Sequence, residues 1–308
     1  MKMYKGSVIA LSVMILMLIF RLAVGGIKVD RKYNVEGERT AITDISLGEV
    51  DKIDFENSDD SFTIVRENNS FYIKDRKSET DKNEAEKLVN DILRIDGRLL
   101  EKDCKDTAQY GFENPKASVR FYVGGKSTAV KIGNLTPAET EYYVMADDGS
   151  VYSIYSSVGS RLLSRKWQLM DLTLFTGGYS NITAVSVNGQ NSFSAEKQSD
   201  GKWKIESEKD GNYEAEDEKF RAVVGRYLDN MYAKRLISNN EKKRSEYGLD
   251  YPEGVVTIID ADKNKTEFKS CRNTDKKEAA VIKNDGNDIF ITIIEYFDML
   301  DIKKEDLT

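Results

Sequence analysis

The stretch Tyr110-Gly111-Phe112-Glu113-Asn114-Pro115 returns 137 residues later as Tyr247-Gly248-Leu249-Asp250-Tyr251-Pro252. The same offset aligns residues 144–149 (VMADDG) with residues 281–286 (VIKNDG). Further upstream, around residues 71–73, the offset falls to 132. Loop insertions of a few residues explain this drift. Because the matches keep one order along the chain, they predict that the body is a tandem duplication.

The repeated hexapeptide has a local explanation in backbone geometry. Asp106 is placed to N-cap a short helical turn at Thr107–Tyr110. Gly111 supplies the left-handed residue that ends the turn, and Phe112 makes the apolar contact of a Schellman-type stop. Pro115 forces the residue before it into an extended conformation and opens the next strand. A structural role, with a binding role as the alternative, is therefore predicted for Tyr110, Gly111, Pro115, Tyr247, Gly248 and Pro252.

Apolar periodicity in the first copy predicts strands and two helices. The helices are expected at Glu84–Ile95 and Ser157–Leu163. Strands are expected to begin at Val50, Phe62 and Phe71 and to cover Ala117–Val123, Thr128–Ile132, Tyr142–Ala146 and Val151–Ile154. Because short turns join these strands, each copy should be an antiparallel sheet with a covering helix. The expected fold class is α+β, as two tandem repeats after an N-terminal transmembrane helix.

The segment Ser7–Gly25 is apolar apart from two serines and Arg21. Its 19 residues would span about 28 Å as a helix, which is close to the thickness of the hydrocarbon core of a bilayer. A membrane anchor is therefore expected, with a signal peptide cleaved near Gly25-Gly26 as the alternative.

The predicted organisation follows from the anchor and the repeats. We expect a cytoplasmic tip and transmembrane anchor at 1–26, a linker at 27–43, and α+β repeats at 44–170 and 171–308. The lysines and arginines that flank the apolar segment do not favour a cytoplasmic N-terminus. A single N-terminal apolar segment nevertheless usually acts as an export signal. The expected localisation is therefore the cell membrane, single-pass, with an extracytoplasmic body.

Composition limits the classes of function. The chain has 308 residues and a net charge of −7; residues 1–39 carry +4, which leaves −11 on the body. An acidic body repels phosphate backbones, so no nucleic-acid partner is expected. The chain has no histidine, the commonest general base and metal ligand. Cys104 and Cys271 occupy non-matching positions in the two copies, so free thiols are expected rather than a disulfide or a zinc site. We expect no enzyme activity and no cofactor.

Three short patterns resemble catalytic or metal-binding motifs but have simpler structural explanations. Residues 124–128 (GGKST) lack the first glycine of a phosphate loop and precede strand-like sequence, so a hairpin turn is expected. Residues 147–149 and 284–286 fit no EF-hand spacing and predict hairpins, with type I′ geometry favoured. Ser194 and Lys197 have the Ser-x-x-Lys spacing of some acyl enzymes. They lie in an expected strand, where residues three apart face opposite sides.

The segment 165–179 connects the two predicted repeats. It contains Trp167, Phe175 and Tyr179 among polar and glycine residues. Pockets commonly lie at domain interfaces, and aromatic residues often anchor protein contacts. A contact surface is therefore expected at these three residues. The alternative is that they only pack the repeats against each other.

An ordered set of motifs along the chain resembles the bacterial domain of unknown function 4340. The matching elements are the N-terminal apolar segment, Val50–Phe55, Tyr110–Pro115, Lys131–Asn134, Tyr142–Val144 and Val151-Tyr152. The resemblance extends from residue 4 to about residue 302. The second copy departs from it at Ser270–Asn273, which stands where Lys131–Asn134 would fall. The resemblance implies an envelope protein, often associated with ABC-type exporters, and it implies no catalytic residues.

Three functions are compatible with the sequence. The first expectation is a non-enzymatic accessory or binding subunit of a membrane export or envelope assembly, with ABC-type transporter subunits as partners. The second is a free-standing envelope module that binds a polymer or protein ligand. The third is a hydrolase that uses carboxylates, which would need a cleft with two close, pKa-shifted acids.

Overall fold

The computed structural model describes residues 38–308, except 59, 230 and 239. The predicted anchor at Ser7–Gly25 and most of the predicted linker lie outside the described residues. Among the helices that are described, none combines the length and the apolar character needed to cross a membrane.

The first repeat contains a nine-stranded antiparallel sheet. Its strands are β1 (Thr40–Asp44), β2 (Val50–Asn57), β3 (Ser61–Glu67), β4 (Ser70–Ile73), β5 (Arg94–Glu101), β6 (Ala117–Val123), β7 (Lys126–Leu135), β8 (Glu141–Ala146) and β9 (Val151–Tyr155). They pair in the order β1-β5-β9-β8-β7-β6-β2-β3-β4.

A second nine-stranded antiparallel sheet follows. Its strands are β11 (Ile182–Asn188), β12 (Phe193–Lys197), β13 (Trp203–Ser207), β14 (Gly211–Ala215), β16 (Arg235–Ser238), β17 (Gly254–Asp260), β18 (Lys265–Asn273), β19 (Glu278–Lys283) and β20 (Asp288–Ile293). They pair in the order β14-β13-β12-β11-β17-β18-β19-β20-β16. A small two-stranded sheet, β10 (Thr173–Phe175) with β15 (Met231–Tyr232), lies beside the second repeat.

Eight strands follow one spatial order in both sheets. Read from β4, the first sheet runs β4-β3-β2-β6-β7-β8-β9-β5, and the second runs β13-β12-β11-β17-β18-β19-β20-β16. Only the ninth strand differs, because β1 is added beside β5 and β14 is added beside β13. The shared order supports the duplication that the sequence predicts, and the large antiparallel sheets fit the expected α+β class.

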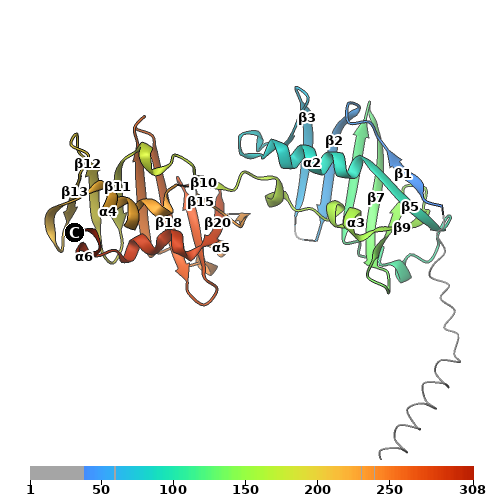
Figure 1. Ribbon diagram of the computed structural model, residues 1–308. Coiled ribbons are helices and arrows are strands. Elements are labelled where there is room, and N and C mark those ends of the chain that lie inside the picture. Colours follow the sequence, from blue (N-terminus) through green and yellow to red (C-terminus); the bar gives the residue numbers. More distant parts are fainter. Residues whose placement is uncertain (1–37, 59, 230, 239) are drawn as a thin grey trace, which may run out of the picture.

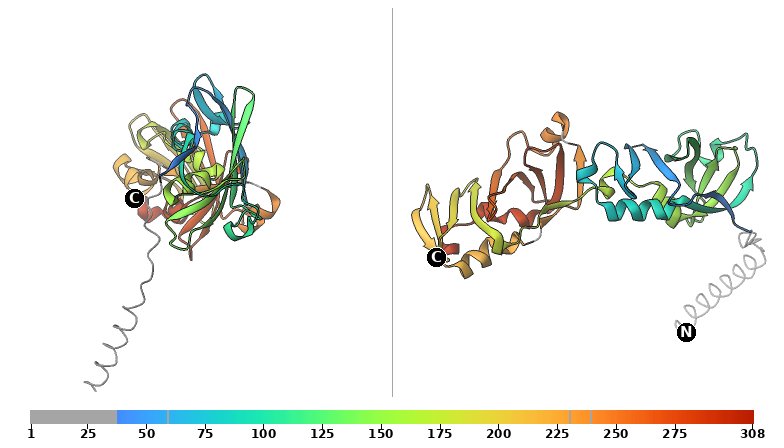
Figure 2. Two further views of the ribbon diagram at one scale, coloured as in Figure 1. Left: turned by 90° about the vertical axis from the view of Figure 1, so that its right-hand side faces the viewer. Right: turned by 90° about the horizontal axis from the view of Figure 1, so that it is seen from above.

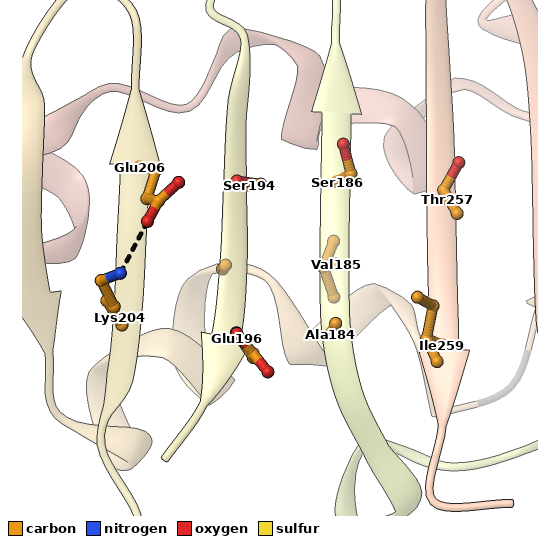
Figure 3. A pocket seen from close by; sticks show the side chains of 10 residues that line it. Ala184, Val185, Ser186, Ser194, Glu196, Lys204, Glu206, Thr257 and Ile259 are labelled. Atoms are coloured by element: carbon orange, nitrogen blue, oxygen red, sulfur yellow. Dashed lines mark hydrogen bonds and ion pairs between the residues drawn. The ribbon is translucent and has the colours of Figure 1, made fainter. Parts of the chain in front are cut away.

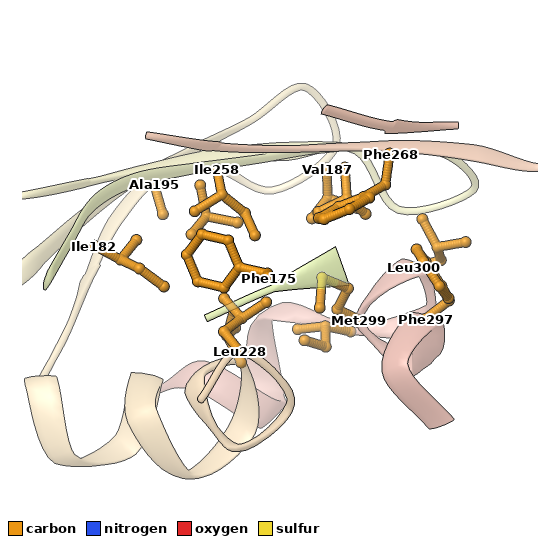
Figure 4. Close-up of a cluster of buried hydrophobic side chains, with 14 of the residues drawn as sticks. Phe175, Ile182, Val187, Ala195, Leu228, Ile258, Phe268, Phe297, Met299 and Leu300 are labelled. Atoms are coloured by element: carbon orange, nitrogen blue, oxygen red, sulfur yellow. The ribbon is translucent and has the colours of Figure 1, made fainter. Parts of the chain in front are cut away.

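Helices cover one face of each sheet. In the first repeat these are α2 (Lys82–Leu93), α3 (Ser156–Leu162) and η3 (Lys166–Leu169), and in the second α4 (Asp217–Val223), η5 (Gly225–Tyr227) and η6 (Ile294–Asp301). Helices α2 and α4 lie on the same side of the two sheets (Figure 2). Each main core fills the space between sheet and helices, as Figure 4 shows for Ile258, Phe268 and Phe297 of the second repeat.

The prediction for the helix at Glu84–Ile95 was wrong at both ends. Helix α2 begins after Asp81, whose carboxylate accepts hydrogen bonds from the backbone N–H groups of two first-turn residues. It ends at Leu93, and strand β5 begins at the next residue, so Ile95 reaches the core from a strand and not from the helix. The sequence analysis did not predict strand β5. Gly97 weakens the strand signal, and a Cβ there would lie 2.6 Å from Ile42 of β1. Strand β1 itself lies almost entirely within the predicted linker.

The predicted hairpin at residues 124–128 is present, since Gly124 and Gly125 both have positive φ between β6 and β7. Type I′ geometry requires positive φ at two consecutive central residues. Asn284 and Asp285 satisfy this requirement, whereas Gly149 is the only residue of the first-copy turn with positive φ. The type I′ prediction was therefore correct for the second copy and wrong for the first.

The repeated hexapeptide forms the same helix stop in both copies. Gly111 and Gly248 have φ of +84° and +73°, after η2 (Ala108–Tyr110) and α5 (Glu241–Glu246). Two backbone hydrogen bonds close each Schellman motif: Gly111 N to Ala108 O and Phe112 N to Thr107 O, then Gly248 N to Ser245 O and Leu249 N to Arg244 O. The predicted N-cap was wrong, since Thr107 occupies that position and makes no side-chain capping bond.

These helix stops cover the second face of each sheet. Phe112 packs with Val151 in a cluster separate from the main core, and Ile154 of the same strand belongs to the main core. Residues three apart on a strand face opposite sides. In the second copy, Leu249 packs with Ile289 and Ile291 in the corresponding way. The hexapeptide therefore covers part of the side of the sheet that the helices leave open.

The two repeats lie end to end, with β1 at one end of the molecule and the C-terminus at the other (Figure 1). Leu236 of β16 is buried in the core of the first repeat, and Phe290 of β20 packs against that core. Arg76, next to β4, pairs with the buried Asp288, with 3.3 Å between Nη1 and Oδ1. We call this contact the seam. Because side chains of the second repeat complete the first core, the two repeats pack as one body.

The helix stops give a direct test. Replacing Gly111 or Gly248 by Ala should lower the free energy of unfolding by about 1–2 kcal/mol. A Cβ would lie 2.6 Å from Asn134 in the first case and 2.8 Å from the Cys271 sulfur in the second, in addition to the positive φ. Urea denaturation is the measurement. Gly48→Ala is the control, because a Cβ there meets nothing within 4 Å; equal stability of all three variants would contradict the prediction.

Candidate functional site

The structure places two of the three predicted contact residues in the second core and the third against the first core. Phe175 is 8% exposed and Tyr179 is 2% exposed in the second core, where Figure 4 shows Phe175. Trp167 is partly buried against the first core. This arrangement favours the packing alternative, and a partner contact at Trp167 stays a prediction.

Tyr179 belongs to a polar network inside the second repeat. Its hydroxyl donates to Asp217 Oδ1 at 2.8 Å and accepts from Trp203 Nε1 at 2.9 Å. Lys197 Nζ lies 2.9 Å from the same Asp217 oxygen. Burial, followed by the neighbouring Asp217 carboxylate, raises the pKa of Tyr179. The tyrosine therefore acts as a hydrogen-bonding core residue that holds the connector to the second sheet.

The Ser-x-x-Lys pattern does not form a catalytic pair. Lys197 faces the network around Asp217, whereas Ser194 is exposed on the other side of β12. Ser194 lines a groove of about 330 Å³ together with Ser186 and Thr257, beside the Lys204–Glu206 ion pair (Figure 3). Small side chains on neighbouring strands produce this groove. The two cysteines, Cys104 and Cys271, are free thiols, as expected.

The seam contains a cavity of about 370 Å³. Lys283 lines it and donates from Nζ to the carbonyl oxygen of Thr173 at 3.2 Å. Burial lowers the pKa of Lys283, and the nearby Asp171 carboxylate partly opposes this. Met170 and Phe290 form part of the apolar wall. The seam therefore has a pocket, although none of the three predicted contact residues lines it.

A second charged cluster lies at the outer end of the first repeat. Arg98 of β5 donates from Nη2 to Glu141 Oε2 of β8 at 3.0 Å. Arg39, which precedes β1, pairs with the other oxygen of the same carboxylate. The ring of Tyr155 lies 3.6 Å from the Arg39 guanidinium. Glu141 is only 8% exposed, so strands far apart in the sequence jointly neutralise a buried charge.

The second repeat contains the same pair at the equivalent place. Arg235 of β16 lies 3.3 Å from Glu278 of β19, and Lys234 lies 3.9 Å from that carboxylate. The strand registers correspond, because Arg98 and Arg235 are opposite β9 and β20, and Glu141 and Glu278 begin β8 and β19. Each copy therefore sets one carboxylate against two cations.

The two clusters differ in exposure. The Glu141 and Arg98 side chains are 10% and 30% exposed, against 22% and 37% for Glu278 and Arg235. Ion pairs that are more desolvated interact more strongly and cost more to break. The first copy therefore has the more tightly held charge cluster.

A cavity adjoins each carboxylate. The first measures about 360 Å³ and is lined by Arg98, Leu100, Thr136, Pro137, Ala138, Thr140, Glu141, Tyr143 and Ser153. The second measures about 260 Å³ and includes Glu278, Tyr247 and Gly248 in its lining.

The hexapeptide tyrosines lie beside these cavities. Tyr110 packs its ring edge-on against Tyr143, at 4.9 Å between centroids, and donates to Glu101 at 3.1 Å. Tyr247 lines the second cavity directly. Pro115 and Pro252 stand further along, just ahead of β6 and β17. The motif that the sequence singled out for its helix stop thus also supports a cavity wall in each repeat.

Sequence reasoning missed the Arg–Glu pairs, although a signal was present. The offset of 137 that aligns the hexapeptides also aligns Arg98 with Arg235 and Glu141 with Glu278. Single charged residues on expected strands resemble ordinary surface positions, so they attract no notice until the two copies are compared residue by residue.

The paired sites predict unequal effects of one substitution. Glu141→Gln should lower the free energy of unfolding by about 2 kcal/mol, because two partly desolvated guanidinium groups lose their carboxylate. Glu278→Gln, at the more exposed equivalent site, should cost less than about 1 kcal/mol. Urea denaturation followed by tryptophan fluorescence measures both. An equal loss in the two variants would contradict the difference in burial.

These features define the chain as a two-repeat α+β protein with a charged cavity on each sheet. The family model described as "Domain of unknown function (DUF4340)" matches residues 72–226. The chain belongs to this family. The match begins in β4, covers most of the first repeat and ends in η5 of the second, a shorter range than the expected resemblance. No curated protein and no solved structure gave a match.

Proposed function

We propose that this chain is a membrane-anchored, extracytoplasmic, non-enzymatic accessory or binding protein of an ABC-type export or envelope assembly. The observation that carries the binding role is the repeated charged cavity on an elongated body of two repeats that pack against each other. A cavity beside an Arg–Glu pair in each repeat suits a protein that works by binding a partner. The anchor at Ser7–Gly25 and the transporter partner come from the sequence and from the family resemblance.

The electrostatics favour a contact role over hydrolysis. A carboxylate-based hydrolase keeps one acid protonated near neutral pH by raising its pKa. Among the described carboxyl groups with a displaced pKa, every displacement is downward. Asp301 is an example: hydrogen bonding from Arg272 lowers its pKa against the effect of burial. The buried Glu141 is paired with two arginines, Arg39 and Arg98, and not with a second acid.

The proposed orientation is testable with protease. Protease added to intact spheroplasts should degrade the body, because an extracytoplasmic domain is accessible without lysis. Immunoblotting against the C-terminal residues provides the measurement, and a cytoplasmic marker protein provides the control. Protection of the body until the cells are lysed would place it in the cytoplasm and contradict the proposal.

The proposed partner is testable by crosslinking in native membranes. A photo-crosslinking residue at Leu100, which is 41% exposed at the first cavity, should capture a membrane transporter subunit. The matched control carries the photo-crosslinking residue in place of Glu208, which is exposed in the β13–β14 turn of the second repeat. Mass spectrometry identifies the captured protein. Equal capture at both positions, or capture of no transporter component, would count against the accessory role.

A further inference from the structure

The outer end of the first repeat carries exposed apolar side chains. Five large apolar side chains are exposed in the described chain, and Leu99, Leu100 and Tyr155 are three of them. All three lie on β5 and β9, at the end of the molecule away from the second repeat (Figure 1). Strand β1 pairs only with residues 94–97 of β5, so it does not cover Leu99. Exposed apolar residues that gather at one place, instead of scattering, commonly mark a contact site.

Leu99 has a counterpart in the second repeat. Leu236 follows it by 137 residues, the offset that aligns the hexapeptides. Leu99 is opposite Tyr152 of β9, and Leu236 is opposite Phe290 of β20. Strands β5 and β16 occupy equivalent places in the two sheets. The exposed fraction nevertheless differs, at 38% for Leu99 and 4% for Leu236. The same position is therefore open in one repeat and covered in the other.

The first repeat is what covers Leu236. Leu236 belongs to the core of that repeat, and Phe290 packs against it. Strand β16 lies beside η3, and Met170, which follows η3, shares the lining of the seam cavity with Leu236. We call residues 166–171 the receiving segment.

Backbone hydrogen bonds hold the receiving segment next to the start of α2. The N–H of Asp171 donates to the carbonyl oxygen of Glu79 at 2.8 Å, and the N–H of Asp81 donates to that of Leu169 at 2.9 Å. The segment therefore forms an ordered surface for the apolar side chains of a neighbouring repeat. The seam shows how this fold covers the sheet end that carries Leu236: it docks against the receiving segment of another repeat.

This chain has no second receiving end of the same kind among its described residues. The receiving segment of the first repeat is occupied by Leu236. Strand β4 ends the first sheet at the seam, whereas the equivalent β13 of the second sheet is paired on its outer side with the additional strand β14. A second copy of this chain would therefore meet β14 and not a free receiving end.

The start of the described chain indicates where the partner lies. The Arg39 guanidinium lies 3.6 Å from the ring of Tyr155, so the chain enters the first repeat beside the exposed apolar residues. The predicted anchor ends at Gly25, and the residues from there to Arg39 can span at most about 50 Å. Under the proposed anchoring, this end of the molecule is held near the membrane surface. A partner that covers Leu99 therefore belongs to the same membrane.

We propose that Leu99 and Tyr152 form a docking surface for a repeat of the same α+β fold in another protein of the membrane assembly. The occupant presents a receiving segment like residues 166–171, with apolar side chains in the places of Leu169 and Met170. The inference rests on the proposed function for the location of the partner, and it deepens that function by naming the partner's fold.

The test is site-specific photo-crosslinking of the full-length chain in native membranes. A photo-crosslinking residue at Leu99 should capture a protein whose sequence contains this repeat. Mass spectrometry should place the crosslink at that protein's counterpart of residues 166–171. The same photo-crosslinking residue at Phe290 is the positive control, because it should react within the chain at the receiving segment. Tyr251, which is 91% exposed on the second repeat, is the matched negative control, with a yield at least about tenfold lower.

A substitution tests the contribution of the Leu99 side chain itself. With the photo-crosslinking residue at Leu100, Leu99→Asp should reduce capture by about tenfold, because the docked surface loses a buried leucine. Leu99 is exposed, so the variant should keep its melting temperature, which thermal unfolding checks. Tyr251→Asp in the same background should leave capture unchanged.

The identity of the captured molecule decides the outcome. Capture of a protein without the repeat, of a second copy of this chain or of lipid alone would overturn the docking proposal, and so would no capture. A transporter subunit without the repeat would overturn it while leaving the proposed function in place. A repeat-bearing protein that belongs to no transporter would support the docking surface and count against the proposed function.

Discussion

A β-sheet has two faces, and apolar residues on either face must be covered; this constraint organises both repeats. Helix α2 and its counterpart α4 cover one face over the main cores. The Schellman turns at Gly111 and Gly248 bring Phe112 and Leu249 onto the opposite face and cover it there. Elsewhere on that face of the second sheet, Ser186, Ser194 and Lys204 line an open groove. The recognisable hexapeptide is therefore the residue pattern that covers part of the sheet face opposite the helices.

An Arg–Glu pair lies at an equivalent place in each repeat. A carboxylate that is almost fully buried must be neutralised, and in the first repeat Arg98 of β5 and Arg39, which precedes β1, do this for Glu141. Strand β1 makes the difference between the copies, because it brings Arg39 to the outer edge of the first sheet. In the second repeat the corresponding edge strand, β16, faces the first repeat at the seam. There Lys234 is the second cation, with its Nζ 3.9 Å from Glu278 Oε1. The first site is consequently deeper and the second more exposed.

The sequence predicted those parts of the fold that local chemistry determines. Strand β6 was predicted with its observed bounds, and the Schellman turns follow from glycine and apolar residues at fixed spacing. Strand β5 was missed because Gly97 and charged residues interrupt its alternation, and its conformation depends on tertiary pairing with β1 and β9. The N-cap at Asp106 was wrong because the turn starts one residue later. The Arg98–Glu141 pair joins residues 43 positions apart, so only the sheet reveals that they meet.

The central claim is that one Arg–Glu pair occupies equivalent sites in both repeats and is coupled more strongly where it is more buried. Double-mutant cycles measure that coupling directly. One cycle combines Arg98→Met with Glu141→Gln, and the other combines Arg235→Met with Glu278→Gln, each followed by urea denaturation. The account predicts a favourable coupling of about 1.5–3 kcal/mol in the first repeat and of less than about 1 kcal/mol in the second. A coupling near zero in the first repeat, or a larger one in the second, would contradict it.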